Sequence, residues 1–160
     1  MRTIHANFET IKYPVGDKIL YNIPIIKNMG DKIKSILIKT KLDYFFPINL
    51  ICSGSSGAII AAIVATILYS NFKKVNIRHI KKDGESSHTT GNYKSYLFNN
   101  YFSDVNIIVD DLICSGVTMR RIFNKIPENI IIDIIAISKI ENENIINFFE
   151  EKKVKILLRN

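Results

Sequence analysis

Short apolar runs of strand length alternate with longer runs of helical length from residue 48 to the end of the chain. The runs typical of buried strands cover residues 48–52, 74–80, 105–111, 129–139 and 154–158. The runs typical of helices cover residues 56–70, 117–126 and 142–153. Buried strands joined through helices pair in parallel and are covered from both sides. We therefore predict an α/β fold, a parallel sheet with helices on both faces.

The residues before position 48 show a different pattern. Residues 3–9 alternate between apolar and polar side chains, as a half-buried strand does. An amphipathic helix is predicted further on, because apolar side chains recur at the spacing of one helix face: Met29, Ile33, Ile36 and Leu37. A chain of 160 residues has the size of one domain. We therefore predict a single domain over residues 1–160.

Charge and cysteine content narrow the possible partners. The net charge of +7 favours an anionic partner, although a solvated basic surface would look the same. The basic residues are spread along the chain without the aromatic–basic motif of a nucleic-acid module, so nucleic acid is disfavoured. No uninterrupted apolar run reaches the roughly 18 residues of a membrane span, and the start does not read as a signal peptide. With two cysteines outside any zinc motif, we expect a cytoplasmic protein without membrane contact.

The pentapeptide LICSG occurs twice, at residues 50–54 and 112–116. Each copy ends a predicted strand and leads into a predicted helix. Ligands of a parallel sheet bind beyond the carboxyl ends of its strands. The free N–H groups and the dipole at a helix start attract anions, and glycine lets the backbone approach a ligand closely. The two copies together predict two anion-binding turns on one edge of the sheet.

Two aspartates, Asp110 and Asp111, precede only the second copy. Carboxylates beside a phosphate-binding turn would repel a phosphate alone, so we expect another group between them. Ribose hydroxyls or a hydrated Mg²⁺ ion would fit that position. The arrangement therefore favours a sugar phosphate, with hydroxyls on the aspartates and the phosphate on residues 114–118.

The stretch IIVDDLICSGVT (107–118) resembles the loop that binds phosphoribosyl diphosphate (PRPP) in type I phosphoribosyltransferases. The resemblance implies their Rossmann-like core over residues 48–160, with a small N-terminal hood at 1–47. It assigns PRPP to Asp110, Asp111, Leu112, Ile113, Cys114, Ser115, Gly116, Val117 and Thr118. It assigns the pyrophosphate group to Ser53, Gly54 and Ser55 in the first turn. Mg²⁺ would be the cofactor, held by Asp110 and Asp111 directly or through water.

The polar segment after residue 80 resembles the flexible loop of orotate phosphoribosyltransferases. Its stretch IRHIKKDGE (77–85) carries basic side chains at positions that bind pyrophosphate in that group: Arg78, Lys81 and Lys82. By this resemblance Lys82 and Asp111 are the catalytic residues. The resemblance also implies a homodimer, since the loop lysine of that group acts across a dimer interface. The histidine of the group's motif is absent, and His88 is a candidate substitute.

These resemblances imply an enzyme that transfers the phosphoribosyl group of PRPP to a nucleobase and releases pyrophosphate. Enzymes for 6-oxopurines carry an acid where this chain has Cys114, so hypoxanthine, guanine and xanthine are disfavoured, and orotate, uracil and adenine remain open. The base would stack in the hood, whose candidate aromatics are Phe8, Tyr13, Tyr21, Tyr44, Phe45 and Phe46. Two alternatives stay open: a PRPP-sensing regulator without catalysis, and a receiver-like or flavodoxin-like domain.

Overall fold

The computed structural model describes residues 23–42, 44–81, 105–113, 115–128, 130–140, 144–152 and 154–158. Several predictions from the sequence therefore lie outside the described residues. These are the strand at 3–9, the aromatic residues before Ile23, Lys82, His88 and Cys114.

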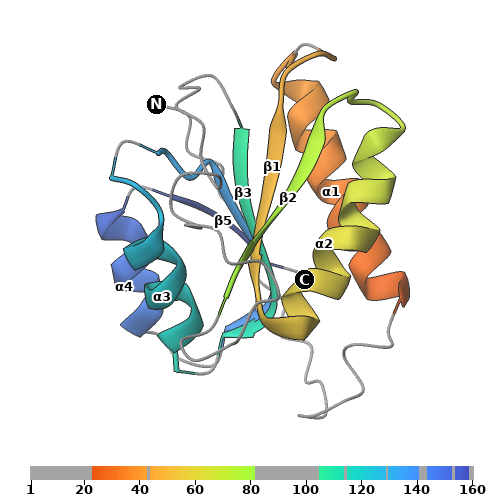
Figure 1. Cartoon of the computed structure of the whole chain (residues 1–160). Helices are drawn as coiled ribbons and strands as arrows, with labels where there is room; N and C mark the ends of the chain where they lie inside the picture. The colour runs from red at the N-terminus through yellow and green to blue at the C-terminus, as the bar shows by residue number, and fades with distance from the viewer. Residues whose placement is uncertain are drawn as a thin grey trace, which may run out of the picture.

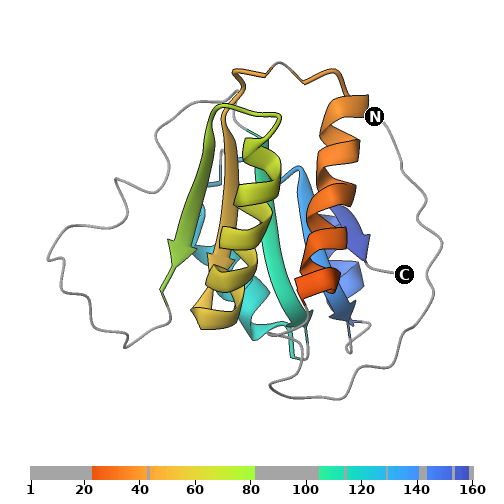
Figure 2. The ribbon, with the colours of Figure 1, turned by 90° about the vertical axis from the view of Figure 1, so that its right-hand side faces the viewer.

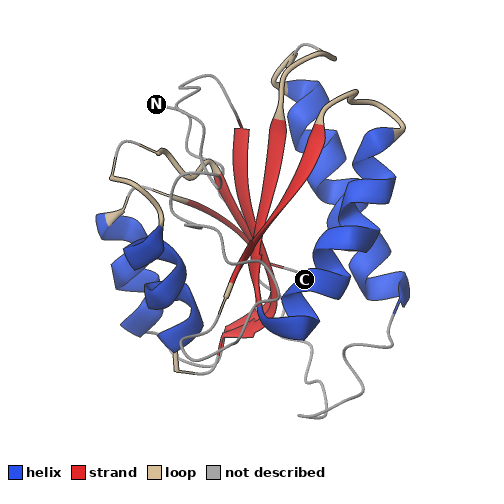
Figure 3. Cartoon of the chain, in the orientation of Figure 1, coloured by secondary structure: helices blue, strands red, loops and turns tan. Residues whose placement is uncertain are grey.

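The described residues form a five-stranded parallel sheet, with α2 between β1 and β2, α3 between β3 and β4, and α4 between β4 and β5 (Figures 1 and 3). The strands are β1 (Ile48–Ser53), β2 (Val75–Ile80), β3 (Val105–Ile113), β4 (Ile134–Ile140) and β5 (Lys155–Leu158). The helices are α1 (Ile23–Lys39), α2 (Gly54–Tyr69), α3 (Val117–Lys125) and α4 (Asn144–Glu151). Every strand pair is parallel. The predicted α/β fold is confirmed.

The strands lie in the order β2-β1-β3-β4-β5. The chain thus adds β2 on one side of β1 and then crosses over to place β3 on the other side. Ligands of open α/β sheets bind where the strand order reverses in this way, outside the carboxyl ends of the strands. The crevice expected of this topology therefore lies between the ends of β1 and β3.

The two faces of the sheet carry separate apolar cores. Helices α1 and α2 cover one face, and α3 and α4 cover the other (Figures 1 and 2). Alternate residues of a strand point to opposite faces. Leu50 and Cys52 of β1 accordingly belong to the core beneath α1 and α2, whereas Ile51 packs with Met119 and Phe149 beneath α3 and α4. Among the described residues, no helix has the length and apolarity needed to span a membrane.

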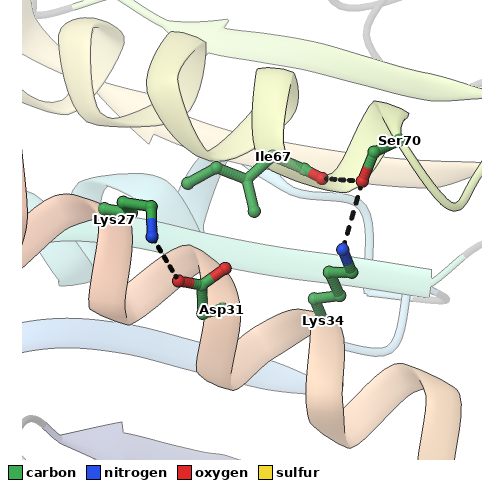
Figure 4. Close-up of polar contacts among 5 residues, drawn as sticks. All are labelled: Lys27, Asp31, Lys34, Ile67 and Ser70. Atoms are coloured by element: carbon green, nitrogen blue, oxygen red, sulfur yellow. Dashed lines mark hydrogen bonds and ion pairs between the residues drawn. The ribbon is translucent and has the colours of Figure 1, made fainter.

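Helix α1 confirms the amphipathic pattern, since Met29, Ile33 and Leu37 are buried against the sheet. It lies tightly against α2, because a Cβ on Gly30 would come within 2.5 Å of Ile67 Cδ1. Polar contacts line the exposed side of this helix pair (Figure 4). Lys34 Nζ donates to Ser70 Oγ (3.2 Å), Ser70 Oγ donates to the Ile67 carbonyl (2.8 Å), and Lys27 pairs with Asp31 (3.4 Å). Part of the predicted hood is thus a layer over the sheet.

Two strand boundaries differ from the predicted ones. β3 continues to Ile113, because β4 pairs with it as far as the Ile113–Ile140 step. The aspartate pair therefore lies inside β3 rather than at its last residues. β4 begins only at Ile134, after a turn in which the Ile130 N–H donates to the Pro127 carbonyl (3.0 Å). The apolar residues before Ile134 suggested a longer strand, but Ile131 is 74% exposed.

Candidate functional site

The two LICSG turns lie at the carboxyl ends of β1 and β3, which are neighbours in the sheet. The start of α2 comes close to the acidic pair of β3. A Cβ placed on Gly57 would lie 3.3 Å from Cys52 Cβ and 3.8 Å from Asp110 Oδ1. Glycine at position 57 therefore allows the first turn to approach the carboxylate that precedes the second. The structure brings together the two motifs that the sequence predicts to share one ligand.

The first turn is fastened to the edge strand β2. Ser53, the last residue of β1, is buried, and its Oγ donates to the Ile80 carbonyl at 2.7 Å. Its hydroxyl forms no capping bond to α2. Gly54 has a φ of +73°, which glycine adopts without steric cost. Ser55 is exposed on the first turn of α2. The turn thus presents Ser55 and the start of a helix, while the hydroxyl of Ser53 donates its proton to the Ile80 carbonyl.

The second turn combines buried and exposed groups. Asp110 is buried, and its Oδ1 accepts a hydrogen bond from the Asp111 N–H at 3.0 Å, while Asp111 itself is half-buried. Gly116 precedes α3 with a φ of +75°. Ser115 is exposed, and its Oγ accepts from the Val117 N–H at 3.4 Å. These groups stand at a helix start, where backbone N–H groups and the helix dipole favour an anion.

The remaining predicted residues of this turn differ in what they can offer. The side chain of Ile113 is buried in the core beneath α3 and α4, so only its backbone could face a ligand. Val117 is 55% exposed and Thr118 is half-buried. Cys114 lies outside the described residues, and so does the side chain of Leu112.

Cys52 is a free, fully buried thiol beneath the first turn. Burial, and secondarily the charge of Asp110, raises the pKa of this thiol to about 11. A thiol is nucleophilic only as the thiolate. Cys52 is therefore neutral and inert at neutral pH, and its part in the site is packing against the start of α2.

The two predicted basic residues that the structure describes lie on or directly after β2, the strand to which the first turn is bonded. Arg78 pairs with Ile51 in the sheet, and its Nε donates to Asn49 Oδ1 at 3.4 Å, toward the amino ends of the strands. Asn49 belongs to a polar row across the sheet with Asn76 and Asn106. Lys81 follows β2 directly, and its carbonyl accepts a hydrogen bond from Lys125 Nζ at 2.9 Å. The contact of Arg78 with Asn49 is thus directed away from Ser53, whereas Lys81 directly follows Ile80, the residue that pairs with Ser53.

Two of the aromatic residues considered for base stacking lie at the wrong end of the sheet. The Tyr44 carbonyl accepts a hydrogen bond from the Lys73 N–H, just before β2 begins, and Lys73 Nζ lies 5.4 Å from the Tyr44 ring centroid and 4.9 Å from that of Phe45. These contacts are at the amino ends of β1 and β2. Tyr44 and Phe45 therefore cannot stack on a base held at the carboxyl ends.

His79 was missed by sequence reasoning. It lies beside Cys52 in the sheet, and its Nε2 is 3.3 Å from the Gly54 carbonyl oxygen. The sequence offered a weak signal, a histidine one residue before the end of a strand, but nothing showed that this strand pairs with β1. Gly57 was missed too, because the sequence could not show how close α2 comes to Asp110.

The donor set of the site fits Mg²⁺ held partly by a substrate. Asp110 and Asp111 supply two carboxyl groups, and the described residues contain no cluster of three or more metal-binding side chains. Mg²⁺ keeps several waters and binds one or two carboxylates together with substrate phosphates. A pair of acids beside two turns that lead into helices suits that mode of binding.

We compared the chain with known protein families, protein sequences and structures. Neither a protein-family model nor a curated protein sequence matches the chain. Solved structures do match. Hypoxanthine phosphoribosyltransferase from Trypanosoma cruzi in complex with the product IMP is 15% identical, with a TM-score of 0.50 over 79% of this chain and 64% of that one. The chain has the phosphoribosyltransferase fold.

Two further phosphoribosyltransferase structures match to the same degree. A second structure of the Trypanosoma cruzi enzyme is 16% identical, with a TM-score of 0.50 over 79% of this chain and 67% of that one. The alanine mutant of an invariant aspartic acid in an HPRT is 19% identical, with a TM-score of 0.50 over 79% of this chain and 69% of that one. The first of the three matches spans less than two thirds of the Trypanosoma cruzi chain. Likeness at this identity establishes the fold, and the chemistry must be argued from the residues.

Proposed function

We propose that the chain is a phosphoribosyltransferase that transfers the 5-phosphoribosyl group of PRPP to a nucleobase and releases pyrophosphate. One observation carries the proposal. Two turns that lead into helices end neighbouring strands at the point of strand reversal, and Oδ1 of the buried Asp110 lies 3.8 Å from the Cβ position of Gly57. PRPP has a phosphate at one end, a diphosphate at the other and a diol between, which is the order of groups that these turns offer.

At the ribose end, Asp110 and Asp111 would accept hydrogen bonds from the two ribose hydroxyls. Residues Cys114 to Thr118 would hold the 5′-phosphate through backbone N–H groups and the hydroxyls of Ser115 and Thr118. The Leu112 and Ile113 backbone would line the approach to this turn. The start of α3 adds a favourable dipole for the phosphate charge. Charge-assisted bonds of this type are about twice as strong as neutral ones.

At the diphosphate end, the first turn would bind through the backbone of Gly54 and Ser55 and through the Ser55 hydroxyl. Ser53 would contribute structure, since its hydroxyl proton is bonded to Ile80. Arg78, Lys81 and Lys82 remain our candidates for neutralising the charge of the departing pyrophosphate. For Arg78, this role requires its guanidinium to exchange the contact with Asn49 for the ligand.

The reaction breaks the bond between ribose C1 and the pyrophosphate oxygen, and pyrophosphate leaves with the electron pair. A nitrogen of the base forms the new bond to C1 and gives its proton to solvent. Asp111 would stabilise the positive charge that develops on the ribose ring, and Lys82 the negative charge of the leaving group. Mg²⁺, when bound, supplies further charge neutralisation on the diphosphate. The two turns hold the reacting ends in a fixed orientation.

The base is the part of the proposal that the described residues leave to experiment. Cys114 in place of an acid favours orotate, another pyrimidine or adenine. The structural neighbours include enzymes that act on hypoxanthine, so the panel of bases must include the purines. The test is incubation with PRPP, Mg²⁺ and single bases, with pyrophosphate release as the readout. We expect release with one base of the first group and none with hypoxanthine or guanine.

A thermal-unfolding measurement with PRPP, made beside the pyrophosphate-release assay, separates the alternatives. Protection of the protein by PRPP against thermal unfolding, without pyrophosphate release for any base, would indicate a PRPP-sensing regulator. A lack of protection would contradict PRPP binding altogether and favour a receiver-like or flavodoxin-like role for the aspartates. An Asp31→Asn variant serves as a neutral control, since Asp31 is an exposed member of an i,i+4 ion pair on α1.

We further propose that the enzyme is a homodimer that associates through the outer face of α2. This helix has no charged residue, in a chain with a net charge of +7. Ile59, Tyr69 and Ile77 are 45%, 67% and 44% exposed on α2 and the edge strand β2. A surface that meets its own copy must avoid like charge, and the side chains of α2 itself carry none. Sedimentation should give a dimer, and Tyr69→Lys should give a monomer.

A further inference from the structure

The first turn is tied to the last residues of β2 by two side-chain hydrogen bonds. Ser53 Oγ donates to the Ile80 carbonyl at 2.7 Å, and His79 Nε2 lies 3.3 Å from the Gly54 carbonyl oxygen. The two bonds run in opposite directions, one from β1 to β2 and the other from β2 to the turn. They fix the position of the turn relative to the edge strand.

The histidine contact constrains which nitrogen carries the proton. A carbonyl oxygen only accepts hydrogen bonds, so Nε2 must carry a hydrogen for the contact to be favourable. The neutral ring with its proton on Nε2 and the protonated ring both satisfy this condition. The neutral ring with its proton on Nδ1 would place two lone pairs against each other.

The same contact sets the direction of the next amide. In a planar trans peptide the carbonyl and the following N–H point in opposite directions. Because the Gly54 carbonyl faces His79 on β2, the Ser55 N–H points away from His79. Gly54 is also the first residue of α2, and it has a φ of +73°. The hydrogen bond from His79 therefore adds to the hydrogen bonding of the helix in fixing the orientation of this peptide.

We propose that His79 is a positioning residue for the pyrophosphate turn: its Nε2–H holds the Gly54 carbonyl and thereby aims the Ser55 N–H at the diphosphate. This inference rests on the proposed function. His79 acts through Gly54 and does not itself contact the substrate. A positive charge on His79 is not required, since the neutral ring with its proton on Nε2 and the protonated ring donate the same hydrogen bond.

The test measures two ligands that occupy opposite ends of the site, inorganic pyrophosphate and ribose 5-phosphate, by calorimetry with Mg²⁺. His79→Leu removes the donor and should weaken pyrophosphate binding about tenfold, the worth of one hydrogen bond to an anion. The affinity for ribose 5-phosphate should stay within about twofold of the wild type, since its turn is built on β3. His79→Gln places an amide N–H₂ near the position of Nε2 and should restore most of the pyrophosphate affinity.

The pH profile separates positioning from direct charge. The ratio of wild-type to His79→Gln affinity for pyrophosphate should stay constant from about pH 6 to pH 8, where histidines commonly change charge. Taking this ratio cancels the titration of pyrophosphate itself. A ratio that falls as the pH rises would show that a cationic His79 binds the anion, and would overturn the positioning role.

Other outcomes are equally decisive. Equal pyrophosphate affinity in the wild type and His79→Leu would overturn this inference and leave the proposed function standing. No binding of pyrophosphate, ribose 5-phosphate or PRPP by the wild type would overturn both. If His79→Leu does not fold, nitrogen-15 NMR of the wild-type imidazole decides without a substrate. The proton must be on Nε2, and a ring protonated only on Nδ1 would contradict the proposal.

Discussion

The two LICSG turns have the same sequence but different supports. In both, the glycine has a left-handed φ, +73° at Gly54 and +75° at Gly116, and a helix follows. The first turn is held from the side, by hydrogen bonds with β2. The second is held from below, where a Cβ on Gly116 would lie 2.6 Å from Ile145 Cδ1 of α4. The shared pentapeptide places a left-handed glycine in each turn, and the contacts of each turn with its neighbours differ.

The surroundings also differ in charge. The second turn follows a buried aspartate and a half-buried one, whereas the first follows apolar strand residues and the neutral thiol of Cys52. An anion alone can bind at the first turn without meeting a carboxylate on its own strand. At the second, a ligand must offer hydroxyls or a metal ion to the acids. This difference in charge supports our proposal that the diphosphate and the sugar bind at different turns.

The largest expected effect comes from the acids. The double variant Asp110→Asn, Asp111→Asn should weaken PRPP binding roughly 10²- to 10⁴-fold, because two charged acceptors are lost from the ribose end. Pyrophosphate affinity should change little, since the first turn is intact. Calorimetry with both ligands measures the two effects, and circular dichroism checks the fold. Wild-type PRPP affinity in this variant would refute the ribose assignment.

The difference in support predicts unequal costs for the two glycines. Gly116→Ala should lower the free energy of unfolding by about 2–4 kcal/mol, through backbone strain and overpacking against Ile145. Gly54→Ala should cost about 1–2 kcal/mol from the left-handed backbone alone. Urea denaturation measures both.

Ile145→Val provides a matched control for the first of these variants. Ile145→Val removes the Cδ1 atom that the new methyl group of Gly116→Ala would meet. Combined with Gly116→Ala, it should restore part of the lost free energy of unfolding. Combined with Gly54→Ala, it should restore none. Equal losses at the two glycines, with no recovery from Ile145→Val, would show that the turns are supported alike.

The smallest expected effect concerns the gap between the turns. Gly57→Ala would place a methyl group 3.3 Å from Cys52 Cβ and 3.8 Å from Asp110 Oδ1. The tight contact and the gain in helix propensity, about 1 kcal/mol, should nearly cancel in stability. PRPP affinity should fall a few-fold, because α2 must move from the acids by a few tenths of an ångström.

Gly30→Ala is the control for this variant, since it crowds α2 from α1, away from both turns. It should lower stability and leave PRPP affinity unchanged. A loss of PRPP affinity in Gly30→Ala as large as in Gly57→Ala would mean that the affinity reports general disturbance of α2 rather than the spacing of the turns.

The sequence predicted the elements of the core well, because buried strands and amphipathic helices leave patterns of apolar residues. Met29, Ile33 and Leu37 are buried on α1 as their spacing required. The strand order was beyond such patterns. Nothing local states that β2 and β3 lie on opposite sides of β1, and this arrangement is what places Gly57 beside Asp110.

The candidate site was predictable where chemistry is local and hidden where it depends on neighbours. The turns and the acid pair were found from their residues. Two hydrogen bonds depend on strand pairing: Ser53 Oγ donates to the Ile80 carbonyl, and Arg78 Nε donates to Asn49 Oδ1. The contact of His79 with Gly54 depends on it too. Each of these was settled by a partner about 25 to 29 residues away along the chain.

The crossing from β2 to β3 also shapes how the chain folds. The Asn49–Asn106 bond that joins β1 to β3 spans 57 residues of sequence, and closing so long a loop is entropically costly and slow. We therefore expect the two halves of the site to meet late in folding. A ligand that binds both turns at once would bind only the folded chain. It would therefore stabilise the pairing of β1 with β3 against unfolding.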